Sequence, residues 1–139
     1  MIARIHILFA ALFLFSCNDE PLGPFTVDEK ILITNSEGQI IGGNYNDWRV
    51  QNPITGLQLQ SPPFPNPTQN SACAIKFSSS RERLRAYIEY PDGTQDIFFI
   101  PTNSSVTHYI YGPGFDNEVQ FIKVYVKDTL FTSGHIQFD

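Results

Sequence analysis

The chain has 139 residues, of which 42% are hydrophobic and 17% charged, and its formal net charge is −5. This length fits one domain, and the hydrophobic fraction is too high for a disordered chain. The negative charge excludes a protein that binds nucleic acid through a basic surface, so we expect no nucleic-acid partner.

Residues 1–16 predict a lipoprotein signal peptide. Arg4 is the only charged side chain in this segment, and the run from Ile7 to Phe15 is apolar without interruption. Because a bilayer-spanning helix needs about 20 apolar residues, this run favours an export signal over a transmembrane helix. Leu14-Phe15-Ser16-Cys17 resembles the lipobox of bacterial lipoproteins, in which a diacylated cysteine becomes the first residue. An ordinary secretory signal is the alternative.

The resemblance implies a covalent lipid on Cys17 as the membrane anchor, and we expect no other cofactor. Each buried methylene contributes about 0.8 kcal/mol and one acyl chain anchors only marginally, so lasting attachment needs two or three chains. Asn18-Asp19-Glu20 resembles the surface-export signal of bacterial lipoproteins, and residues 17–29 have the composition of an acidic, proline-containing tether. We therefore expect lipid anchoring at the outer membrane, on its periplasmic or cell-surface side.

Residues 30–56 predict a short hairpin followed by a segment that contains Trp48 and packs on the rest of the protein. Strands are expected at 30–34 and 39–41, with Asn35-Ser36-Glu37-Gly38 as the turn. From residue 57 onward, short runs alternate with turn residues such as Pro91-Asp92-Gly93 at intervals of about 8 to 12 residues. The expected strands are 57–60, 71–78, 83–90, 95–100, 106–111, 119–127 and 130–138.

This pattern predicts an all-β fold, with a single Ig-like antiparallel β-sandwich of about seven strands over residues 57–139. Strand alternation places Cys73, Ile75 and Phe77 on one inward face. The same alternation directs two further sets inward, Leu84/Ala86/Ile88/Tyr90 and Ile122/Val124/Val126. With Cys17 lipidated, Cys73 has no disulfide partner, and we expect it to be a buried packing thiol.

The start of this region resembles a known family. Pro63-Phe64-Pro65-Asn66-Pro67-Thr68, followed by Ala74-Ile75-Lys76-Phe77, is similar to the opening of the FlgD-type Ig-like domains and of the C-terminal sorting domains of type IX secretion. The resemblance implies that the Pro-Asn-Pro corner leads into the first long strand, with Phe64 as the aromatic residue that pins it. We transfer the fold and not the sorting activity, because a fold does not specify function.

Catalytic chemistry has little support in the sequence, so we expect a non-enzymatic protein without a metal site. His108 and His135 lack the Cys/His spacing typical of zinc and are predicted to be solitary strand histidines. Glu89, Asp92 and Asp96 flank a hairpin turn, where carboxylates are normally solvated.

Arg81, Arg83 and Arg85 form the one basic cluster. The favoured interpretation is a solvated face with Glu82 and Glu89 nearby. The alternative is a contact for phosphate headgroups or an acidic partner.

Several aromatic residues are predicted on the outward strand faces: Tyr87, Tyr109, Tyr111, Phe121 and Tyr125. Strands that are apolar on both sides are usually covered on both sides. We expect the cover to come from the 30–50 segment, through Ile31, Ile33, Ile40, Ile41 and Trp48. The alternative is an exposed aromatic surface that binds a partner protein or a glycan.

The sequence therefore predicts a non-enzymatic, membrane-anchored lipoprotein with an Ig-like structural or binding module at the outer membrane. Two alternatives remain open. One is an accessory subunit of a larger membrane protein complex, and the other is a surface glycan-binding module that uses the aromatic face.

Overall fold

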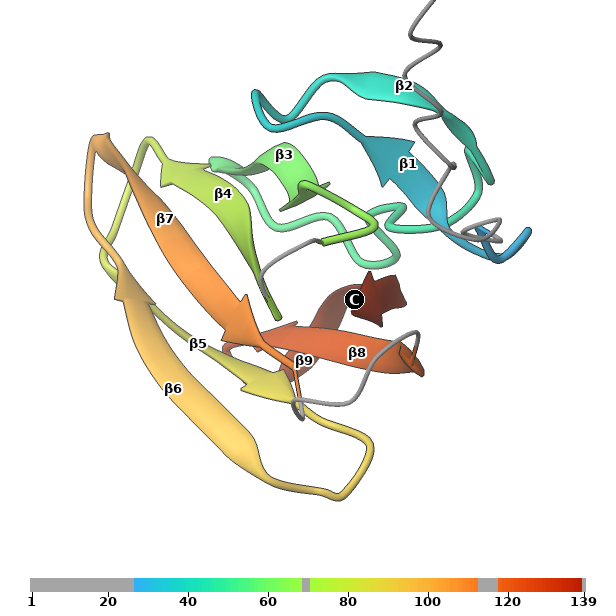
Figure 1. Cartoon of the computed structure of the whole chain (residues 1–139). Coiled ribbons are helices and arrows are strands. Elements are labelled where there is room, and N and C mark those ends of the chain that lie inside the picture. The colour runs from blue at the N-terminus through green and yellow to red at the C-terminus, as the bar shows by residue number, and fades with distance from the viewer. Residues whose placement is uncertain (1–26, 69–70, 113–117, 139) are drawn as a thin grey trace, which may run out of the picture.

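A computed structural model describes residues 27–68, 71–112 and 118–138 (Figure 1). These residues form nine strands and no helix, and every pair of named strands is antiparallel. β1 (Leu32–Thr34) and β2 (Ile40–Gly43) form a hairpin. A three-stranded sheet has the order β3 (Leu57–Phe64), β4 (Ala72–Ser79), β7 (Ser104–Tyr111). A four-stranded sheet has the order β6 (Gln95–Ile100), β5 (Leu84–Glu89), β8 (Glu118–Val126), β9 (Thr129–Phe138).

The strand order confirms the predicted all-β antiparallel sandwich. In an immunoglobulin constant-type domain, the first, second, fifth and fourth strands form one sheet and the third, sixth and seventh form the other. If β3 is counted as the first strand, one sheet here contains the first, second and fifth strands (β3, β4 and β7). The other sheet contains the fourth, third, sixth and seventh strands (β6, β5, β8 and β9). The difference from the constant-type domain is the fourth strand, β6, which here belongs to the opposite sheet and pairs with β5.

The core lies between the two sheets and has the predicted inward residues. Cys73, Ile75 and Phe77 of β4 are buried, and so are the inward sets of β5 and β8 except Tyr90, which is partly buried. Phe77 has its ring centroid 5.6 Å from that of Phe98 and 6.3 Å from that of Phe131. Phe77 is therefore packed against rings from the opposite sheet.

β3 is longer than predicted, because it continues through Pro62 and Pro63 to Phe64. Proline is tolerated in an edge strand, where its missing N–H removes no ladder bond, and β3 pairs only with β4. The β3–β4 register also shifts between Leu59 and Ser61 and between Ser61 and Phe64. Phe64 itself is partly buried and lies near the turn at Gly38, outside the main hydrophobic cluster.

The predicted cover of the outward aromatic faces by the 30–50 segment is wrong. Ile40 and Ile41 are exposed, whereas Trp48 is buried beside β9. A Cβ at Gly134 would lie 2.5 Å from the indole nitrogen of Trp48, so only glycine leaves room for this ring. The indole N–H donates to the His135 carbonyl at 3.1 Å. The segment thus packs along β9, because the glycine in that strand opens a space for the indole.

Candidate functional site

The structure divides the predicted aromatic face between two sheets. Tyr87 of β5 and Tyr125 of β8 are cross-strand partners on the outward face of the four-stranded sheet, and Phe121 lies farther along β8 on that face. Tyr109 and Tyr111 belong to β7, in the other sheet, and are exposed there. The five residues therefore do not form one surface. Cys17, the predicted lipidation site, lies outside the described residues.

A compact apolar and cationic surface covers β6, β5 and β8. We call it the aromatic–arginine patch, and it consists of Arg83, Arg85, Tyr87, Ile97, Phe99 and Tyr125. The Tyr87 and Tyr125 rings stack with centroids 4.9 Å apart and an interplanar angle of 11°. Ile97 and Phe99 are 50% and 46% exposed. Because all of these side chains except that of Arg83, which directly precedes β5, come from three hydrogen-bonded strands, the sheet backbone holds them in a defined arrangement.

The arginines of the patch lie over aromatic rings. The Arg83 guanidinium carbon is 4.2 Å from the Phe99 ring centroid, and that of Arg85 is 5.7 Å from the Tyr87 centroid. Arg85 also lies 3.5 Å from the Asp128 carboxylate, whereas the neighbouring Glu82 pairs with Lys127. Cation–π contacts hold a guanidinium in place while leaving its edge free to donate hydrogen bonds. Two of the three predicted arginines thus join the aromatic residues, and Arg81 lies exposed before β5.

An ion pair separates the patch from Phe121. The Lys123 ammonium lies 3.1 Å from the Glu89 carboxylate, and the hydrogen bond between them raises the pKa of Lys123. Phe121 is 43% exposed and packs tilted against His135, with ring centroids 4.9 Å apart. Partial desolvation and the nearby Asp128 raise the pKa of Tyr87 above its ordinary value, and its hydroxyl is protonated at neutral pH as in an ordinary tyrosine. At that pH the tyrosine can therefore donate a hydrogen bond as well as accept one.

Sequence reasoning missed Ile97 and Phe99 as surface residues. Strand 95–100 reads Gln-Asp-Ile-Phe-Phe-Ile, so alternation places Ile97 and Phe99 opposite Phe98 and Ile100. That pattern was available in the sequence. It did not show that Phe98 and Ile100 would be the buried pair, because both faces of the strand are apolar.

His108 and His135 lie on strands, as predicted, and each contacts one carboxylate from another part of the chain. His108 of β7 lies 2.8 Å from the Asp96 carboxylate of β6 and stacks on Phe98, with centroids 4.2 Å apart. Of the three hairpin carboxylates, Asp96 is 43% exposed and pairs with His108, and Glu89 is 26% exposed and pairs with Lys123. Asp92 accepts hydrogen bonds from Thr94, which lower its pKa. These pairs join strands that are distant in sequence, so spacing alone could not reveal them.

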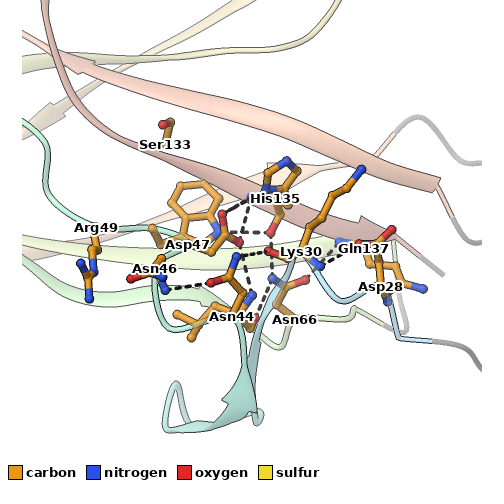
Figure 2. Close-up of polar contacts among 12 residues, drawn as sticks. Asp28, Lys30, Asn44, Asn46, Asp47, Arg49, Asn66, Ser133, His135 and Gln137 are labelled. Atoms are coloured by element: carbon orange, nitrogen blue, oxygen red, sulfur yellow. Dashed lines mark hydrogen bonds and ion pairs between the residues drawn. The ribbon is translucent and has the colours of Figure 1, made fainter.

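Asp47 connects the segment before β3 to β9. Its carboxylate accepts hydrogen bonds from the backbone N–H groups of Leu32 and His135, and it lies 3.1 Å from Nδ1 of His135 (Figure 2). Burial raises the pKa of Asp47, and the hydrogen bonds from His135 oppose that rise. These contacts satisfy backbone groups on an otherwise open strand edge. We call them a joint because they connect β1 to β9.

Asn66, at the centre of the Pro-Asn-Pro corner, is fully buried and completes this joint. Its amide nitrogen donates to the carbonyls of Leu32 at 3.0 Å and His135 at 2.9 Å. Its side-chain oxygen accepts from the Gln137 N–H at 3.1 Å (Figure 2). One amide therefore links β1, the corner and β9.

Cys73 is buried, as predicted for a packing thiol. Burial raises its pKa to about 12, so the thiol stays protonated at neutral pH. Since the thiolate is the reactive form, this environment makes Cys73 a poor nucleophile.

Within residues 27–68, 71–112 and 118–138, no group of His, Cys, Asp and Glu is placed to hold a metal ion. The same residues include no helix long and apolar enough to cross a membrane. In comparisons with known proteins, no family model, no curated protein and no solved structure matches the chain.

Proposed function

We propose that this protein is a non-enzymatic lipoprotein, anchored at the outer membrane through lipid on Cys17, whose β-sandwich is a binding module. The apolar run and Leu14-Phe15-Ser16-Cys17 support the anchor. The aromatic–arginine patch carries the binding role. Ile97 and Phe99 are about half exposed beside the partly buried Tyr87 and Tyr125, and exposed apolar clusters of this kind mark interaction sites.

The geometry of the patch favours a protein partner, as in an accessory subunit of a membrane complex, over a glycan. A sugar binds by stacking on an open ring face, and one face of each aromatic ring in the patch is already occupied. Arg83 covers one face of Phe99, and Tyr87 and Tyr125 stack on each other. Tyrosine and arginine are enriched at the energetic centres of protein interfaces.

The charge of Arg83 favours an acidic contact on that partner. Among the described residues, Arg83 has no carboxylate within ion-pair distance, whereas Arg85 has Asp128 and Lys123 has Glu89. A partner carboxylate could therefore accept hydrogen bonds from the Arg83 guanidinium without displacing an existing ion pair.

Two variants test the binding role. The tagged full chain is isolated from detergent-solubilised membranes of its native host, and proteins recovered in stoichiometric amounts are quantified. Ile97→Glu places a charge inside the patch and should abolish recovery of the partner. Tyr45→Glu makes the same kind of change at an exposed aromatic residue that belongs to neither the patch nor β7, and it should leave recovery unchanged. Equal recovery with both variants, or no stoichiometric partner with the native chain, would contradict the proposed role.

Intact-mass spectrometry tests the anchor. The lipid-modified protein should begin at Cys17 and carry the added mass of two or three acyl chains. An unmodified thiol at this position would refute the anchor while leaving the binding experiment valid.

A further inference from the structure

The free edges of the two sheets are protected to different degrees. An unprotected edge strand offers a row of N–H and C=O groups to any other strand. Along β9, the carbonyl of Phe131 accepts from the Gln51 N–H, and that of Ser133 accepts from the Trp48 N–H. Farther along the strand, the N–H groups of His135 and Gln137 donate to the side chains of Asp47 and Asn66. β9 is therefore unavailable to a new strand.

Along most of its length β7 lacks the usual protective features, although the backbone of its last residue, Tyr111, is hydrogen-bonded to the side chain of Tyr90. Its eight residues, Ser104–Tyr111, contain no proline, lysine, arginine or carboxylate. Its register with β4 runs without a shift from Ser105 to Tyr111. By contrast, β3 contains two prolines and two register shifts. Long, regular and uncharged edges are those that accept another strand.

The ladder with β4 shows which backbone groups of β7 face outward. The Gly112 N–H donates to the Ser71 carbonyl at 2.7 Å, continuing the β4–β7 pairing by one residue. Since bonding direction alternates along an antiparallel strand, Val106, His108 and Ile110 bond to β4. Ser105, Thr107 and Tyr109 therefore direct their N–H and C=O groups to the free edge.

These groups lack partners in the described part of the chain. No described residue hydrogen-bonds to the backbone of Thr107 or Tyr109 on that edge, and the Ser105 carbonyl receives only the hydroxyl of the adjacent Ser104, at 3.5 Å. Positions two residues apart repeat about every 6.8 Å, which matches the spacing of an extended strand. The edge is thus complementary to another β-strand.

We propose that a second copy of this chain pairs with β7 through its own β7, antiparallel about a two-fold axis at Thr107. Thr107 then faces Thr107 of the second copy, and Ser105 and Tyr109 face each other on both sides. Each of these three facing pairs exchanges two N–H···O bonds.

Self-pairing is favoured because β7 has no charged residue that would meet its own copy across the axis. His108 is already paired with Asp96 on the inward side. The contact is isologous and therefore closes at two chains. It uses an edge of the three-stranded sheet and is independent of the aromatic–arginine patch.

Thr107→Pro is the decisive variant. It removes an N–H that makes no bond to β4 and places the proline ring on the free edge, where an edge strand tolerates it. Sedimentation velocity of the full chain in non-ionic detergent, from about 1 to 100 μM, should show a dimer that Thr107→Pro weakens by at least about tenfold. Thr107→Val keeps the N–H and the branched side chain and should dimerise normally. Thermal melting should show all three proteins folded.

Cysteine cross-linking provides a second measurement. The two Thr107→Cys residues would face each other as a hydrogen-bonded pair at a Cα separation of about 5.5 Å, so a short thiol-to-thiol cross-linker should join them and give covalent dimers. Thr94→Cys, in the β5–β6 turn, measures background cross-linking, including any through Cys17. The proposal is overturned by a monomeric native chain at all concentrations, by unchanged dimerisation of Thr107→Pro, or by Thr107→Cys cross-linking no faster than Thr94→Cys. Native mass spectrometry showing a different polypeptide bound at β7 would also overturn it.

Discussion

Replacing Asn66 by alanine should destabilise the protein far more than the same replacement of an asparagine on the surface. The substitution removes three side-chain hydrogen bonds, to Leu32, His135 and Gln137, at a fully buried position. Each such bond contributes about 1 kcal/mol net, and a buried group left without a partner costs a further 1–3 kcal/mol. The His135 carbonyl keeps its bond from Trp48, which limits the loss. We therefore expect a decrease of about 3–5 kcal/mol in the free energy of unfolding.

Urea denaturation followed by tryptophan fluorescence measures this change, because Trp48 lies beside the affected strand. With a slope of about 1–3 kcal/mol per molar urea, the midpoint should move down by 1 M or more. Asn46→Ala, the same substitution at an exposed position, should stay within about 0.5 kcal/mol of the native chain. Trypsin should also cleave Asn66→Ala faster at Lys30 and Arg49. A decrease below about 1 kcal/mol for Asn66→Ala would refute the role of the amide as a joint.

Three further predictions concern the core. Phe77→Ala should destabilise by about 3–5 kcal/mol, measured by the same denaturation, whereas Phe99→Ala at the half-exposed patch should change stability by less than about 1 kcal/mol. Gly134→Ala should destabilise by about 1–3 kcal/mol because the new methyl group meets the Trp48 indole; a neutral result would contradict the packing of this ring. Cys73 should resist alkylation at pH 8 until the chain unfolds. Because the folded thiol holds its proton up to about pH 12 and the unfolded thiol loses it near pH 9.0, folded stability should fall as pH rises through that range. The contribution of Cys73 to this slope should approach about 1.4 kcal/mol per pH unit, so Cys73→Ala should show a correspondingly smaller slope than the native chain.

The period-two pattern and the turn residues were sufficient to predict the strands. Sets such as Ile122/Val124/Val126 are buried as predicted because alternation along one strand is a local property. The Asp92-Gly93 turn also forms where expected, with Gly93 at a φ of 83° that favours glycine. The end of β3 was predicted less well, since tolerance of Pro62 and Pro63 depends on the strand being at a sheet edge.

The candidate site could be predicted only in part. The outward direction of Tyr87 and Tyr125 follows from alternation. Their stacking on each other, and the position of Arg83 over Phe99, depend on the pairing of β5 with β8 and β6. The separation of Tyr109 and Tyr111 from these residues follows from β7 joining the other sheet.

By itself, the sequence determined the all-strand class, the inward face of β4, β5 and β8, and the main turns, because each depends on neighbouring residues. Only the tertiary structure decided which strand edges are covered, which carboxylate pairs with His108 or His135, and which aromatic residues share a surface. The physical reason is that these features depend on contacts between strands far apart along the chain, and the backbone hydrogen bonds that set those contacts are the same for every side chain.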